Sequence, residues 1–162
     1  MIFLNGCAVG TFYAEEQGDQ QAGLRVATSL PGNTGIYLSD RNSCKKQSSK
    51  KWVLGWFHHW KGQAYRRGYD KRIGLEGGNI YKDHMYAEYH VNLEPQPRIF
   101  IENVSGAIAD LNFCGGHFDL DIEVNKNYEI FVDDTCSVMA YELTGKGSGF
   151  ERRKVEMQKV CL

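Results

Sequence analysis

This chain contains many short runs in which apolar and polar residues alternate. In the clearest run, residues 118–124, Phe118, Leu120, Ile122 and Val124 alternate with acidic residues. A two-residue period places side chains on alternate faces of a β-strand, so the pattern predicts strands with one buried face. Similar strand-like runs occur at residues 35–38, 52–57, 86–91, 98–102, 128–132, 137–143 and 153–160. About eight short strands separated by turn signals predict an all-β fold, a single antiparallel β-sandwich or barrel-like domain.

The length and net charge of the chain exclude several classes of protein. A length of 162 residues fits one domain with a continuous core. No run approaches the roughly 18 apolar residues that a membrane-spanning helix needs. The net charge of −1 lacks the basic excess of a dedicated nucleic-acid-binding protein, so no nucleic-acid partner is expected.

Residues 4–7, Leu-Asn-Gly-Cys, end an apolar run and precede small residues and then a polar segment. This stretch resembles the lipobox of bacterial lipoproteins, in which cleavage exposes a cysteine that receives acyl chains. The resemblance implies that Cys7 is the lipidation site and that residues 1–6 are the remnant of a signal peptide. It also implies that residues 7–22 form the lipidated N-terminus and tether, and that residues 23–162 form the β domain.

The lipobox-like stretch lacks the cationic start and the apolar region of roughly 7–15 residues that a signal peptide has. Either the true signal extends upstream, or the match is accidental, with residues 2–4 in a first strand and Cys7 as a buried thiol. Ala8 follows the cysteine where an Asp would favour inner-membrane retention. The resemblance therefore implies an outer-membrane lipoprotein, attached to the membrane through its lipid anchor.

Five cysteines occur, and none forms a Cys-x-x-Cys pair. The absence of such pairs argues against zinc-finger and thioredoxin-like sites. Setting aside Cys7 leaves an even number, suited to two disulfides in an oxidising compartment. The alternative is a set of reduced thiols in a cytosolic core.

One disulfide pairing follows from strand geometry. Residues 118–124 and 128–132 flank a polar turn at residues 125–127, which predicts a β-hairpin. Cys114 and Cys136 are equally distant from the centre of this turn, and facing residues of a hairpin lie close enough for a bridge. We therefore predict Cys114–Cys136, and by elimination Cys44–Cys161, among the three pairings that four cysteines allow.

Charge is unevenly distributed along the chain. Residues 41–72 hold ten Lys and Arg but one acid, whereas residues 102–151 hold ten Asp and Glu but two bases. The two regions either complement each other within the fold, or the basic one presents a face to an anionic partner.

The basic region contains all three tryptophans and several tyrosines. Aromatic side chains between bases can stack on sugar rings while the bases hold anionic groups. The candidate binding patch is Trp52, Trp56, Trp60, Tyr65, Arg66 and Arg67. Strand alternation predicts positions 52, 56 and 60 on one face, which is also the pattern of a core stripe.

Catalytic and metal motifs give no match. His58 and His59 are adjacent and would point to opposite faces of a strand, so no metal site is predicted, and no cofactor is expected. Asp119, Asp121 and Glu123 are explained as a solvent-facing row. No nucleophile elbow, phosphate-binding loop or dinucleotide fingerprint occurs, so no catalytic residue is assigned.

Together these features predict an outer-membrane lipoprotein with a non-catalytic binding or structural role, as an assembly component, inhibitor or immunity-type protein. Its partner is expected to be a protein or an anionic glycan. The alternatives are a cytosolic β protein with free thiols and an enzyme acting on an envelope glycan. The candidates for the catalytic acid and base of such an enzyme are His58, His59, His117, Asp119, Asp121 and Asp134.

Overall fold

The computed structural model describes residues 13–15, 18–29, 33–41, 44, 51–58, 64–67, 71–78, 85–94, 96–105 and 112–161. The described residues form two β-sheets, with one 3-10 turn, η3 (Gly147–Gly149). None of the described residues belongs to a helix that is long and apolar enough to cross a membrane.

The first sheet has six strands in the spatial order β11-β7-β6-β2-β3-β4. Their bounds are Gln158–Val160 (β11), Asn112–Asp119 (β7), Pro97–Ser105 (β6), Asn33–Asp40 (β2), Lys51–His58 (β3) and Ala64–Arg67 (β4). All neighbouring strands in it are antiparallel.

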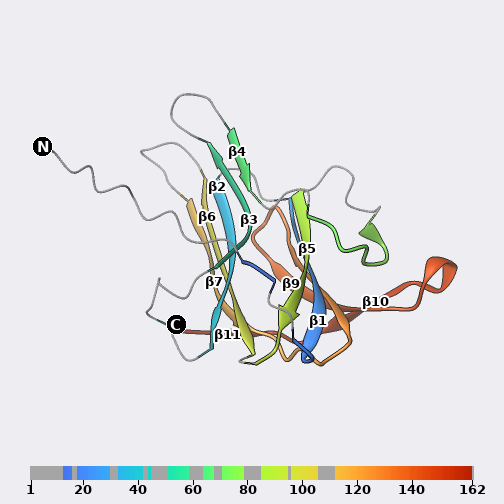
Figure 1. The fold of residues 1–162 in the computed structure, drawn as a ribbon. Coiled ribbons are helices and arrows are strands. Elements are labelled where there is room, and N and C mark those ends of the chain that lie inside the picture. Colours follow the sequence, from blue (N-terminus) through green and yellow to red (C-terminus); the bar gives the residue numbers. More distant parts are fainter. Residues whose placement is uncertain are drawn as a thin grey trace, which may run out of the picture.

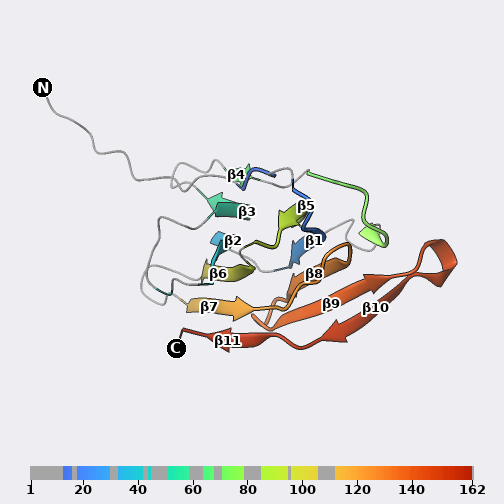
Figure 2. The same ribbon diagram turned by 60° about the horizontal axis from the view of Figure 1, so that its bottom comes forward.

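The second sheet has five strands in the order β10-β9-β8-β1-β5. Their bounds are Glu151–Val155 (β10), Val138–Thr144 (β9), Asn127–Val132 (β8), Gln21–Thr28 (β1) and Met85–Asn92 (β5). Figure 2 shows the two sheets as separate layers, with β9 and β10 in a long hairpin that reaches past the body. One pair, β1 with β8, is parallel, so the sheet is not wholly antiparallel as predicted.

The core lies between the sheets, which makes the fold a sandwich and not a closed barrel. Leu24 of β1 and Ile130 of β8 meet Ile36 and the other apolar residues of the six-stranded sheet in one fully buried cluster. The hydroxyl group of Tyr89 in β5 donates a hydrogen bond across the layers to the carbonyl oxygen of Val53 in β3, at 2.6 Å. The prediction of an all-β fold is confirmed.

The predicted hairpin of residues 118–124 and 128–132 is wrong. β7 ends at Asp119 and pairs with β6 and β11, whereas β8 pairs with β1 and β9 in the other sheet. Residues 120–126 carry the chain between the layers, and their alternating burial continues because Leu120 and Ile122 pack into the core. The alternation therefore indicates an extended segment with one buried side. Here that segment includes the end of β7 and the connection between the two sheets.

The predicted strand at residues 153–160 is two strands. β10 pairs with β9 in the five-stranded sheet, and β11 pairs with β7 in the six-stranded sheet. The chain changes sheet at residues 156–157, so the C-terminal segment joins the two layers along one side of the sandwich.

Residues 13–15, within the predicted tether, contact the edge of β5. The hydroxyl group of Tyr13 accepts from the backbone N–H of Asn92 and donates to the carbonyl oxygen of His90, both at 3.2 Å. The carboxylate of Glu15 accepts from the backbone N–H of His90 at 2.7 Å. These side chains supply hydrogen-bond partners to a strand edge beside which no further strand lies among the described residues.

Candidate functional site

The hairpin of β3 and β4 forms one edge of the six-stranded sheet and contains most of the predicted binding patch. Five of the six patch residues lie in it: Trp52 and Trp56 in β3, and Tyr65, Arg66 and Arg67 in β4. The register places Trp56 directly opposite Arg66. Figure 1 shows β4 at the outer end of this hairpin, past the ends of β2 and β5.

A β-bulge interrupts the alternation that predicted a shared tryptophan face. Trp52 is opposite Tyr37, but the next pair joins Leu54 to Ile36, so β3 has one extra residue between them. The spacing of four residues between positions 52 and 56 therefore does not give an unbroken two-residue period. Trp60, the sixth residue of the patch, lies outside the described residues.

The acidic region finds most of its described partners outside the basic region. The carboxylate of Asp119 accepts two hydrogen bonds from Arg98, at 2.6 and 3.0 Å. That of Glu142 pairs with Arg153. A pair between Arg41 and Asp121 at 3.1 Å does join the two regions, but Asp121 is 96% exposed. Ion pairs between the two regions therefore account for few of the described partners of the acidic residues.

Residues 71–78, which we call the covering segment, follow β4 in the chain after a short interval and lie over the outer face of the five-stranded sheet. At its start, the guanidinium group of Arg72 stacks 3.3 Å above the ring of Tyr86 and donates hydrogen bonds to the carbonyl oxygens of Lys71 and Tyr86. Cation–aromatic stacking of this kind holds the long side chain in place.

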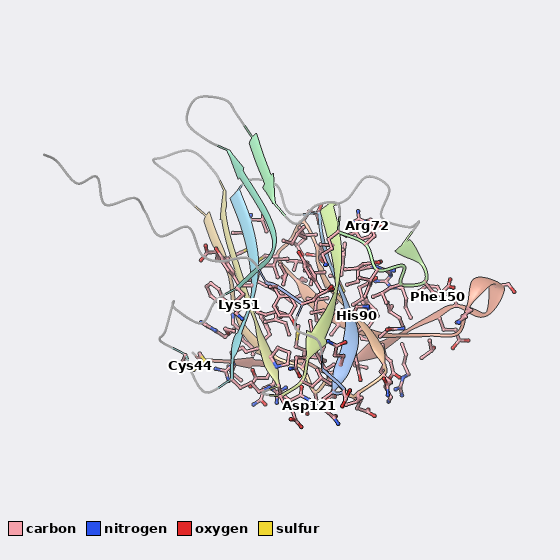
Figure 3. The ribbon with its side chains drawn as sticks, viewed as in Figure 1. Cys44, Lys51, Arg72, His90, Asp121 and Phe150 are labelled. Carbon is pink, nitrogen blue, oxygen red and sulfur yellow. A yellow bond between two sulfur atoms is a disulfide. The ribbon has the colours of Figure 1, made fainter. Side chains whose placement is uncertain are left out.

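A recess of about 640 Å³ opens between the covering segment and the β9–β10 turn. Its lining is rich in glycine: Gly74, Leu75, Glu76, Gly77, Gly78, Gly147 and Phe150. A Cβ atom on Gly77, which has a φ of +76°, would lie 2.4 Å from the ring of Phe150. Figure 3 shows Phe150 on the projecting β9–β10 hairpin, directly after its turn. Among the described residues that line the recess, Glu76 is the one titratable group.

A buried charge cluster beneath the covering segment was not predicted. The guanidinium group of Arg25 in β1 donates to the carboxylates of Glu88 in β5 and Glu129 in β8, at 2.9–3.1 Å. These three residues are at most 1% exposed and face each other in the strand register. Glu129 also pairs with Arg152 of β10. The separation of these residues in the chain gave no sequence signal that they meet.

The covering segment is fixed to this cluster at several points. Nη2 of Arg25 donates to the carbonyl oxygens of Leu75 and Glu76, at 2.6 and 2.8 Å. Oε2 of Glu88 accepts the three consecutive backbone N–H groups of residues 73–75, at 2.9–3.1 Å. A buried carboxylate with this many donors is fully satisfied. The cluster is therefore a structural support for the outer face.

The residues proposed for an enzymatic site have other partners. His117 contacts the ring of Phe100, with ring centroids 4.5 Å apart. The hydrogen bonds from Arg98 lower the pKa of Asp119 against a smaller opposing effect of burial. Asp134 is exposed in the turn after β8. Neither His59 nor the side chain of His58 is among the described parts of the structure.

Both predicted disulfides are present. Cys114 of β7 is bonded to Cys136 in the turn after β8, with Cα atoms 6.1 Å apart, so this disulfide joins the two sheets. Cys44 is bonded to Cys161 after β11, with Cα atoms 5.6 Å apart, so it ties the C-terminal end to the β2–β3 connection. The pairing is as predicted, although the hairpin used to predict it is not. Cys7 lies outside the described residues.

No group of three His, Cys, Asp or Glu side chains with metal-binding geometry occurs within the described part of the chain.

Comparison with known proteins identifies no family. No protein-family model matches the sequence, and no curated protein matches it. Among solved structures, the membrane-binding domain of pneumolysin is similar at a TM-score of 0.33 and 12% identity, over 79% of this chain and all of that domain. A structure of pneumolysin is similar at 0.32 and 12% identity, over 78% of this chain and 24% of that one. Similarity at this level does not bear on function.

Proposed function

We propose that this protein is a lipoprotein of the bacterial outer membrane that acts by binding a partner and not by catalysis. Cys7 is the lipidated residue, and the sandwich is the binding domain outside the cytosol. The observation that carries the proposal is the use of four of the five cysteines in two disulfides. Such bonds persist in oxidising compartments such as the periplasm.

The disulfide pairing supports the lipidation proposal because the remaining cysteine is Cys7, in the lipobox-like stretch. Lipidation would convert the Cys7 thiol into a thioether and leave the protein without a free thiol. Several acyl chains would then give the stable anchoring that one chain cannot provide.

Thiol titration of the purified native protein under denaturing, non-reducing conditions tests the proposal. We expect no reactive thiol, together with a mass increase on the N-terminal peptide that begins at Cys7. One reactive thiol would indicate disulfides without lipidation and would contradict the anchor. Five would indicate the cytosolic alternative and would contradict the proposal as a whole.

We further propose that the β3–β4 edge binds an anionic envelope glycan. The proposal is supported by the register of Trp56 with Arg66 and by acidic residues whose described partners lie mostly outside the basic region. Aromatic rings can stack on sugar rings, and arginine forks can hold phosphate or carboxylate groups.

Titration of the full chain carrying Cys7→Ser with lipopolysaccharide or soluble peptidoglycan fragments tests this surface. Removing both bases in Arg66→Ala/Arg67→Ala should weaken binding by about tenfold or more, since a charge-assisted hydrogen bond contributes about 1.5–3 kcal/mol. Trp56→Ala/Trp60→Ala should weaken it as well. The matched control, Lys154→Ala/Lys159→Ala, removes the same charge from the opposite side of the sandwich and should change affinity less than the patch variants. Equal losses in the control and patch variants would contradict the assignment of the surface.

A further inference from the structure

The disulfide between Cys44 and Cys161 lies against a positively charged side chain. Nη1 of Arg98 is 3.1 Å from Sγ of Cys161 and 3.4 Å from Sγ of Cys44. Arg98 is 6% exposed, and its Nε and Nη2 atoms donate to the carboxylate of Asp119. One buried cation is therefore shared between a disulfide and a carboxylate.

The other disulfide has different surroundings. Cys114 and Cys136 are half-buried and pack against the apolar core cluster. Cys44, in contrast, is exposed, and Figure 3 shows it at the margin of the molecule. An external thiolate can approach Cys44 from solvent, whereas both sulfurs of the core-side disulfide are partly covered.

We propose that Cys44–Cys161 is a thiol–disulfide exchange site for an external dithiol, and that Arg98 controls its reactivity. A thiolate of the dithiol attacks Sγ of Cys44, forming a mixed disulfide and breaking the Cys44–Cys161 bond. The electron pair remains on Sγ of Cys161 as a thiolate. Arg98 stabilises this leaving group, because the closer of its two sulfur contacts is to Cys161.

The second thiol of the external dithiol completes the exchange. As a thiolate it attacks the dithiol's own sulfur in the mixed disulfide and releases Cys44. The dithiol loses two electrons and two protons and becomes a disulfide. The protein gains two electrons and binds two protons, one at each cysteine once the thiolates are neutralised.

Reduction at this site would release the C-terminal strand. β11 has three residues, none of which is buried, and within the described part of the chain its one strand neighbour is β7. Cys161 follows it directly, so the disulfide is the covalent attachment of this strand to the β2–β3 connection. Without it, the short strand would separate readily and leave the edge of β7 open.

The two disulfides of one molecule provide an internal comparison. The full chain carrying Cys7→Ser is equilibrated with graded ratios of reduced to oxidised dithiothreitol, quenched in acid and alkylated, and each cysteine is quantified by mass spectrometry. We expect Cys44–Cys161 to be half-reduced at a ratio about tenfold lower than Cys114–Cys136, since stabilising the thiolate shifts the exchange equilibrium. Equal midpoints would overturn the proposal.

Two substitutions separate an electrostatic role of Arg98 from a structural one. Arg98→Gln removes the cation and should make Cys44–Cys161 harder to reduce. Asp119→Asn removes the carboxylate that shares the cation, and should make the disulfide easier to reduce. If Arg98 only supported the fold, both variants would destabilise the structure around the Cys44–Cys161 disulfide, and both would make this disulfide easier to reduce. That common direction would contradict the proposal.

A thiol titration covers the case in which Arg98→Gln does not fold. In the chain carrying Cys7→Ser, the further change Cys44→Ser leaves Cys161 as a single thiol beside Arg98, and its alkylation rate against pH gives its pKa. We expect a pKa below about 8.5, the ordinary value for a cysteine. A pKa at or above that value would overturn the assigned role of Arg98 while leaving the anchor and glycan proposals unaffected.

Discussion

Both faces of the five-stranded sheet are buried where β5, β1 and β8 lie side by side, but by different means. On the inner face, Leu24 of β1 and Ile130 of β8 pack against the other sheet. On the outer face, Arg25, Glu88 and Glu129 of adjacent strands are at most 1% exposed beneath the covering segment. The inner face is filled by volume, whereas the outer face is held together by directed ion pairs and hydrogen bonds.

This difference shows that the charged residues of the outer face can be buried only while their charges compensate one another. Apolar contacts are non-directional and scale with buried area. A buried ion pair instead contributes only while every partner is present, because each remaining charge loses its compensation when one is removed. Substitutions on the two faces of the same strand should therefore have different consequences.

The largest effect is expected from Arg25→Met. This change keeps a long, apolar side chain but leaves Glu88 and Glu129 buried beside each other without the shared cation. Breaking a buried pair in this way costs about 3–5 kcal/mol. Urea unfolding followed by circular dichroism measures the free energy of unfolding. Arg152→Met, which removes a partner of Glu129 that is itself 29% exposed, is the control and should cost less. A loss below about 1 kcal/mol for Arg25→Met would make the outer cluster dispensable.

On the inner face, Leu24→Ala should cost slightly less, about 3 kcal/mol, through lost apolar burial and a residual cavity. Because Leu24 and Arg25 point to opposite faces, the Leu24→Ala/Arg25→Met double variant should show additive losses within about 0.5 kcal/mol. The same urea experiment measures both variants and their combination. A coupling energy well above that limit would show that the two faces do not act independently.

Strand β1 shows why part of the fold could not be predicted from the sequence. Its residues 22–28 are all buried, so the segment lacks the alternation of polar and apolar residues that predicts a half-buried strand. It contains the charged residue Arg25, whose side chain is compensated by carboxylates 63 and 104 residues away. A pattern read along the chain cannot contain partners brought by distant strands.

The disulfide prediction was correct although its geometric argument was not. The sequence predicts Cys114 and Cys136 opposite each other in one hairpin, but Cys114 lies in β7 of one sheet and Cys136 in the turn after β8 of the other. Residues 120–126 cross between the sheets and bring the two cysteines together just as a hairpin would. Equal spacing about a turn is thus compatible with pairing within a sheet and with pairing between sheets.

The binding patch could be predicted only in part. The sequence shows which aromatic and basic residues occur together in the segment that forms β3 and β4. It does not show the β-bulge near Trp52, which interrupts the alternation of side chains along β3.

A smaller effect is expected where the covering segment meets the sheet. A Cβ atom on Gly23 would lie 2.3 Å from Oδ1 of Asn127 and 2.9 Å from Cδ2 of Leu75. Gly23→Ala should therefore displace Leu75 and cost about 1–2 kcal/mol by overpacking. Hydrogen exchange at the amides of residues 73–75, which bind Glu88, should become faster. The control is Gly149→Ala, where a Cβ atom meets no atom within 4 Å. Unchanged exchange in Gly23→Ala would mean that Leu75 does not hold the covering segment down.

The smallest effect is expected at the edge of β5, where neither face provides full burial. Partial burial acts to raise the pKa of Glu15, but the N–H of His90 and the ammonium group of Lys71 outweigh it and lower the pKa. Because the folded-state pKa is below the unfolded value, the contact stabilises the fold at neutral pH. The stabilisation is lost as the pH falls through the folded-state pKa. For a partly exposed pair it amounts to at most about 0.5 kcal/mol.

Glu15→Gln should therefore lower stability at pH 7 by this small amount and have less effect at an acidic pH below the folded-state pKa, where the carboxyl group is protonated in both states. Tyr13→Phe is the matched control, because it removes two neighbouring hydrogen bonds to the same strand edge without removing a carboxylate. Its effect should be equal at the two pH values, as measured by urea unfolding at each. An equal, pH-independent loss in both variants would show that Glu15 acts at this edge as a hydrogen-bond acceptor alone. A loss confined to neutral pH would show that its charge matters at the exposed edge, as the charges of Glu88 and Glu129 do beneath the covering segment.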